Sequence, residues 1–162
     1  MTLKNLDKKF LINSFLVLLI FLIDRFSKIY VIYLDKKYIG SEIFSSKFLN
    51  ISLIWNEGIA FGLFSFNDKI FYNILTIIIL IIILIIFFMT TKSNGFKKYS
   101  LLMILGGALG NVFDRLHYKA VPDFLDLHVG NFHWFIFNVS DIFITLGVLI
   151  LIYLEIIDKK EN

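Results

Sequence analysis

An unbroken apolar run at residues 77–88, inside a hydrophobic stretch from 72 to 89, constrains this chain more than any other feature. The run is rich in β-branched isoleucine, which also suits a strand. An isolated strand, however, cannot cross lipid without closing a barrel, because its backbone groups would lack partners. The length and continuous apolar character therefore predict a membrane-spanning helix.

Three further hydrophobic stretches flank this run, at residues 10–34, 99–113 and 135–157, and the first is interrupted by the charged segment 24–28. A cleaved signal peptide is an alternative for the first stretch, because Lys4, Lys8 and Lys9 precede it. No small-residue cleavage site follows, and the apolar pattern resumes after Lys28, so we interpret it as a helix of the folded protein.

The composition also indicates a membrane protein. Hydrophobic residues make up 58% of the 162 residues, against roughly 45–50% in soluble domains, and the mean hydropathy is +0.80. The length suits one domain. We predict an all-α integral membrane protein, a single membrane-embedded domain over residues 1–162, with four transmembrane helices at about 10–34, 70–89, 99–116 and 135–157.

Clusters of lysine predict the orientation. Lysines precede the first stretch, lie between the second and third (Lys92, Lys97 and Lys98), and follow the fourth (Lys159 and Lys160). The positive-inside rule then places both termini in the cytoplasm and residues of about 35–70 and 115–134 outside. We expect a small extracytoplasmic β-sheet region at about 36–68, with short strands at 47–55 and 61–66. The net charge of +3 is spread between hydrophobic runs, so no nucleic-acid surface is indicated.

Four aspartates lie near the outer ends of the predicted helices or in the outer segment, and each is costly to place in or beside a membrane. They are Asp24, Asp114, Asp123 and Asp141. Two have a structural explanation nearby. Asp24 is expected to pair with Arg25 or Lys28, and Asp114 with Arg115 or with Asn111 one turn earlier.

Asp123 and Asp141 have no basic residue within three positions. Asp123 follows Pro122, which predicts a turn or an extended segment. Asp141 follows Asn138 at a spacing of three, so the amide is expected to orient the acid at the start of the fourth helix. Two carboxylates brought together share one proton and can act as base and acid.

Other sites are less well supported. Gly106 and Gly110 have the small-xxx-small spacing that permits close helix contact, and this motif ends at Asn111.

The spacings of His117, His128 and His133 match no zinc pattern, so we predict no metal and no cofactor. Ser140 has no base beside it in sequence. Cysteine is absent, which excludes disulfides and thiolate chemistry.

Two other classes remain open on these residues alone. A small proton-coupled transporter or channel subunit also uses intramembrane aspartates, but it would spread them through the bilayer depth. A scaffold without catalysis would not need four acids in one layer.

Five blocks of sequence resemble the lipoprotein signal peptidases, also called signal peptidase II, in that family's order. They are residues 24–28 (DRFSK), 56–62 (NEGIAFG), 106–115 (GGALGNVFDR), 121–124 (VPDF) and 137–141 (FNVSD). The resemblance implies an aspartic endopeptidase of the bacterial inner membrane, with a small outer β-sheet and its active site at the outer face. It implies cleavage of prolipoproteins just before a diacylglyceryl-modified cysteine.

The resemblance also assigns residues. It implies that Asp123 and Asp141 are catalytic, and that four polar residues bind substrate or support the pair: Asn56, Asn111, Arg115 and Asn138. Asp24, Lys28 and Asp114 are left as structural polar residues. The family usually has valine at Pro122 and alanine at Ser140. The proline puts the local backbone pairing in doubt, and the serine is expected to add a hydrogen bond to the pair.

Overall fold

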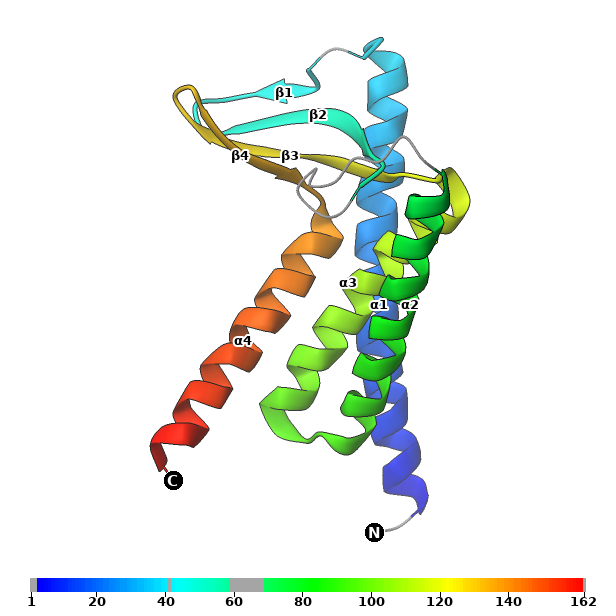
Figure 1. The fold of residues 1–162 in the computed structure, drawn as a ribbon, viewed down its shortest axis with the longest axis vertical. Coiled ribbons are helices and arrows are strands. Elements are labelled where there is room, and N and C mark those ends of the chain that lie inside the picture. The colour runs from blue at the N-terminus through cyan, green and yellow to red at the C-terminus, as the bar shows by residue number, and fades with distance from the viewer. Residues whose placement is uncertain (1–2, 41, 59–68, 162) are drawn as a thin grey trace.

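The computed structural model of the chain describes residues 3–40, 42–58 and 69–161. Four helices form a bundle with a small sheet across one end, and both chain ends lie at the opposite end (Figure 1). The elements are, in order, α1 (Leu3–Lys37), β1 (Phe44–Ser45), β2 (Leu49–Asn56), α2 (Lys69–Lys92), α3 (Gly95–Tyr118), β3 (Val121–Val129), β4 (Phe132–Phe137) and α4 (Val139–Glu161). The fold is thus mostly helical with a small antiparallel sheet.

The sheet has the order β1-β2-β3-β4, and each neighbouring pair is antiparallel. Only half of it comes from the first outer segment. Residues 121–134, predicted as part of an outer loop, instead form a hairpin together with residues 135–137, and this hairpin turns at Gly130, where φ is +58°. The predicted fourth helix also began too early, because Phe135 lies in β4 and the helix begins at Val139. The strand predicted at 61–66 lies outside the described residues.

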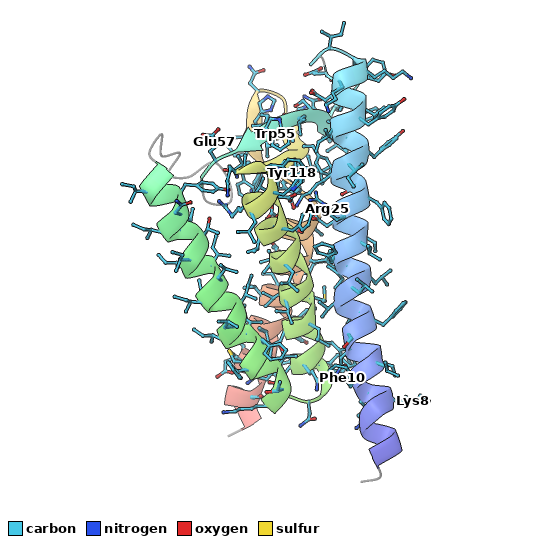
Figure 2. The ribbon with its side chains drawn as sticks, turned by 90° about the vertical axis from the view of Figure 1, so that its right-hand side faces the viewer. Lys8, Phe10, Arg25, Trp55, Glu57 and Tyr118 are labelled. Atoms are coloured by element: carbon cyan, nitrogen blue, oxygen red, sulfur yellow. The ribbon has the colours of Figure 1, made fainter. Side chains whose placement is uncertain are left out.

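Polar and apolar residues are distributed opposite to the pattern of a water-soluble protein. Asp24, Lys28, Asp114, Asn138 and Ser140 are fully buried, whereas large apolar side chains along the helices are exposed. Figure 2 shows these side chains pointing away from the bundle along α1 and α2. Exposed apolar area of this extent needs an apolar environment. By length and composition, two helices among the described residues are able to cross a bilayer, Tyr72–Lys92 and Val139–Asp158.

Glycines let α3 lie against both α1 and α4. A Cβ placed on Gly106 would lie 2.9 Å from Cβ of Ile20 in α1, and one on Gly107 would lie 2.6 Å from the backbone oxygen of Ser140 in α4. A Cβ on Gly110 would collide with the side chains of Asp24 and Ser140. This close approach brings Asn111, the next residue, to the interface of three helices.

Gly107→Ala is expected to destabilise the fold by about 1–3 kcal/mol, because the added methyl meets backbone that cannot move without separating α3 from α4. Thermal unfolding in detergent measures the effect. Gly106→Ala is the comparison, since its nearest neighbours are Cβ of Ile20 at 2.9 Å and the backbone oxygen of Val17 at 3.2 Å, both farther away than the oxygen that Gly107 meets, so its stability loss should be smaller. Equal stability losses in the two variants would contradict this description of the interface.

Candidate active site

Asp123 lies on β3 and is held by two amide side chains. Nδ2 of Asn56 donates to its Oδ2 at 2.8 Å, and Nδ2 of Asn138 donates to its Oδ1 at 2.6 Å. The sheet positions the first donor, because Asn56 pairs with Val121, two residues from Asp123 and on the same face. Pro122 does not interrupt this pairing, since it lies in register opposite Trp55. The doubt raised by the proline is thereby removed.

Asp141 lies in the first turn of α4, where it forms a reciprocal cap with Asn138. The backbone N–H of Asn138 donates to Oδ2 of Asp141 at 3.1 Å, and the backbone N–H of Asp141 donates to Oδ1 of Asn138 at 3.2 Å. This is the capping-box arrangement, which satisfies two backbone donors at the helix start. From α3, Nδ2 of Asn111 donates to Oδ1 of Asp141 at 2.8 Å.

Asn138 therefore joins the two carboxylates, though not as the sequence suggested. Its side-chain amide was expected to orient Asp141. The amide oxygen does accept the backbone N–H of Asp141, but the amide nitrogen donates to Asp123, and the Asp141 carboxylate is reached by the backbone N–H of Asn138. Asn138 is fully buried. One residue thus fixes both acids relative to each other.

Both acids line one cavity of about 510 Å³. Its polar end also contains Asn56, Asn111, Arg115 and Asn138, and its apolar remainder comes from α2, α3 and α4, including Ile82, Ile86, Ala108, Ile144 and Val148. Burial and, secondly, the charge of Asp141 raise the pKa of Asp123 to about 6. The sequence does not reveal the apolar lining, because an isoleucine that faces lipid and one that lines a cavity look alike in sequence.

A buried charge network lies behind the pair, centred on Lys28. Its Nζ donates to Asp24 at 2.8 Å, to Asp114 at 2.7 Å and to Oδ1 of Asn111 at 2.9 Å. Asp114 also pairs with Arg25. The expected pairing of Asp24 with Lys28 is present, but the pairing of Asp114 with Arg115 is wrong, because the carboxylate points to α1 instead.

Asp24 also caps the start of α4. Its Oδ1 accepts the backbone N–H of Ser140 at 2.9 Å, so a residue of α1 caps α4. The hydroxyl of Ser140 is buried and has no hydrogen-bond partner among the described residues, so the hydrogen bond expected from it to the pair is not found. The sequence contained no signal for this contact between helices.

Arg115 supports the sheet side of the cavity. Its guanidinium donates to the backbone oxygen of Gly58 and lies over the ring of Tyr72, 5.5 Å from its centroid. The N–H of Gly58 donates to Oδ1 of Asn56 at 2.9 Å. Arg115 is thus connected through Gly58 to the amide that holds Asp123.

An aromatic cluster surrounds Arg25 beside the buried charge network. Trp55 meets Tyr118 edge to face, and the guanidinium of Arg25 lies over the rings of Tyr118 and Phe113. Figure 2 shows Arg25, Trp55 and Tyr118 together at the sheet end of the bundle, far from Lys8 and Phe10. These contacts cover Asp114, which is fully buried behind Arg25.

Known proteins resemble this chain over nearly its whole length. A lipoprotein signal peptidase of Pelagibacter ubique (strain HTCC1062) is 48% identical over 157 residues, which cover 96% of this chain and 95% of that protein. A lipoprotein signal peptidase of Anaplasma phagocytophilum (strain HZ) is 37% identical over 157 residues, which cover 95% of this chain and 97% of that protein.

Solved structures and a family model agree with these relatives. One solved structure is described as a bacterial membrane enzyme, determined by the in meso method at 2.3 Å resolution. It superposes on this chain with a TM-score of 0.73 and is 30% identical in sequence, and the match covers 93% of this chain and 90% of the solved chain. The family model described as Signal peptidase (SPase) II matches residues 16–157. The chain therefore belongs to the signal peptidase II family.

Proposed function

We propose that Asp123 and Asp141 are the catalytic pair with which this chain, a bacterial membrane enzyme, removes the signal peptide from prolipoproteins. The observation that carries the proposal is Asn138, which binds both carboxylates at the polar end of one cavity. A proton-coupled transporter is not favoured. The buried acids lie together near the sheet, and α2 carries no acidic residue.

The surroundings of the two acids give them different roles. Asp141 accepts a backbone N–H at the start of α4, where the helix dipole stabilises negative charge. Lys28 adds positive charge two hydrogen bonds away, because its Nζ donates to Asn111, which in turn donates to Asp141. Asp123 receives only neutral amide donors among the described residues. On these contacts we propose that Asp141 is the carboxylate that acts as base and that Asp123 carries the proton.

The reaction then needs only these two groups and water. Asp141 removes a proton from water as the water oxygen attacks the scissile carbonyl carbon, and Asp123 protonates the carbonyl oxygen. In the second step Asp123 recovers a proton from a hydroxyl of the tetrahedral intermediate, and Asp141 protonates the leaving nitrogen. The carbon–nitrogen bond breaks, and both acids return to their starting states.

The raised pKa of Asp123 predicts the alkaline limb of the pH profile. The form with one proton on the pair is active, so kcat/KM of the free enzyme should fall as the pH rises through about 6. Asn56→Ala removes a donor that lowers the pKa of Asp123, so the limb should move to higher pH. Initial rates across pH 4–9 measure the shift relative to the unsubstituted chain. A limb that stays fixed or moves to lower pH would contradict the role of Asp123.

The cavity suits a substrate that is partly lipid. Its polar end lies under the sheet and its apolar end runs between helices, so a peptide bond at the acids leaves acyl chains beside isoleucine and valine. Helices of 35, 24, 24 and 23 residues are each about 34 Å or longer at 1.5 Å per residue, enough for a hydrocarbon layer of about 30 Å. We infer four transmembrane helices.

The orientation follows from the lysines and the sheet. Both chain ends and the α2–α3 connection lie at the end of the bundle opposite the sheet (Figure 1), and the lysine clusters occur in these same regions. We infer that this end is cytoplasmic and that the acids face the outer leaflet.

Single cysteines in this cysteine-free chain test the orientation. A cysteine at Ser45 or Asn131, both exposed in the sheet region, should react with an impermeant thiol reagent in intact spheroplasts. A cysteine at Ser93, between α2 and α3, should react only after lysis. The reverse labelling pattern would place the acids on the cytoplasmic side.

A further inference from the structure

We propose that Asp126, His128 and His133 form a binding site for a divalent transition-metal ion, with Zn²⁺ as the expected occupant, which joins the two strands of the β3–β4 hairpin. Each residue offers one ligand atom, and these atoms all lie within 4.8 Å of one another. The spacing in sequence gave no sign of such a site. Antiparallel pairing creates it, because His133 lies directly opposite His128 in the sheet.

The cluster is assembled by the pleat of the sheet. Asp126 and His128 are two residues apart on β3 and so lie on the same face, and His133 meets both from β4. Nδ1 of His133 lies 2.9 Å from Oδ2 of Asp126, and the two imidazole rings are stacked with centroids 5.0 Å apart. Two imidazoles and a carboxylate form a common zinc ligand set that leaves a fourth position for water.

One nitrogen of the cluster lacks a hydrogen-bond partner among the described residues, and the carboxylate of the cluster has a histidine as its ionic partner. Nδ1 of His128 is buried and has no hydrogen-bond partner among them. The Asp126 side chain is 10% exposed, and His133 is its only salt-bridge partner in the described part of the chain. A buried carboxylate requires positive charge nearby, and a buried imidazole nitrogen requires a partner. A bound cation satisfies both groups at once.

The geometry needs only small adjustments to hold the ion. Zinc lies about 2.0–2.2 Å from nitrogen and oxygen ligands, so ligand atoms on a tetrahedral ion are about 3.3–3.6 Å apart. The observed spacings lie on both sides of that value. The His133 side chain is half exposed, so its ring has room to turn toward an ion held between it and Asp126. His128 is anchored by its backbone N–H, which donates to the backbone oxygen of Phe48 at 3.0 Å.

The site is separate from the catalytic pair. Asp126 follows Asp123 by three residues on β3, about 10 Å at the rise of a strand, and none of the three ligands lines the cavity that contains the pair. The ion would therefore act on the sheet, by joining strands on which Asp123 is carried, and not on the peptide bond. The proposal does not depend on the catalytic roles assigned above.

Zinc titration of the purified full-length chain in detergent, carrying no histidine tag, tests the site. We expect one Zn²⁺ per chain by competition with a chromogenic chelator. Zinc at about 100 times its dissociation constant should raise the thermal midpoint by roughly 5–10 °C. His128→Gln and His133→Gln should each weaken binding at least about tenfold. His117→Gln, which changes the histidine outside the cluster, should leave binding unchanged.

Two further measurements keep the test independent of whether the variants fold. In the unsubstituted chain, zinc should protect His128 and His133, but not His117, from modification by diethylpyrocarbonate. Chelation should lower the thermal midpoint and leave turnover intact at moderate temperature. Absence of saturable binding, equal protection of all three histidines, or binding retained in both cluster variants would overturn the site. Turnover lost on chelation and restored by zinc would overturn its separation from catalysis.

Discussion

Asp123→Asn and Asp141→Asn are each expected to lower the cleavage rate by about two to four orders of magnitude, the usual contribution of a general acid or base. In place of Asp141, an amide cannot remove a proton from water or deliver one to the leaving nitrogen. In place of Asp123, it cannot protonate the carbonyl oxygen. The substitution keeps the shape of the side chain, so the helices should still assemble. Initial rates on a lipidated precursor, at matched amounts of membrane-inserted protein, measure the loss.

Asp35→Asn is the matched control, because Asp35 lies in the last turns of α1 and outside the cavity. It should retain full activity. Asp114→Asn provides a contrast, since Asp114 balances Arg25 and Lys28 and its loss should reduce stability together with activity. Inactivity of Asp114→Asn alone, in a fully stable protein, would show that the wrong acid has been paired with Asp141.

Lys28→Met is expected to destabilise the fold by about 3–5 kcal/mol, because it removes one partner of a buried ion pair and leaves the other charge uncompensated. Asp24 and Lys28 are both fully buried, and Lys28 is the only ion-pair partner of Asp24 among the described residues. The loss also frees Asn111, which holds Asp141. Thermal unfolding in detergent should therefore show a midpoint lower by roughly 10 °C.

A second substitution separates charge from packing. Asp24→Asn added to Lys28→Met removes the uncompensated charge, so the double variant should be more stable than Lys28→Met alone. Lys36→Met, on the exposed end of the same helix, should change the midpoint little. A loss in Lys36→Met equal to that in Lys28→Met, or no recovery in the double variant, would contradict the network.

The sequence predicted the helices well, because apolar runs of about twenty residues are visible without tertiary information. All four predicted helical stretches overlap helices, with differences at the ends. The start of α4 was missed, because 135–137 is as apolar as the helix that follows it. Only the cap formed by Asn138 and Asp141 marks the boundary, and that cap depends on geometry.

The candidate site was predicted as a set of residues but not as an arrangement. The gathering of Asp24, Asp114, Asp123 and Asp141 at one end follows from the orientation of four helices. Which partner each acid takes does not. The pairing of Asp114 with Arg25, 89 residues away, is set by how closely α3 approaches α1, and that distance depends on glycines whose neighbours the sequence does not reveal.

The histidines show the same limit. The spacing of His128 and His133 in the sequence matches no metal motif. The two side chains are brought together by the pairing of β3 with β4 and not by their spacing. Residues 115–134 were predicted as an outer loop and 135–157 as a helix, so that pairing was not expected. Recognition of the Gly130-Asn131 turn as a hairpin signal would have brought both imidazoles together.

The most direct test of the account is cleavage of a purified precursor by the purified chain. A prolipoprotein with a diacylglyceryl-modified cysteine is incubated with the enzyme in detergent and a metal chelator, and its products are weighed by mass spectrometry. We predict a released signal peptide and a protein beginning at the modified cysteine, with neither product formed by the double variant Asp123→Asn/Asp141→Asn. Formation of both products by that variant at the rate of the unsubstituted chain would contradict the account.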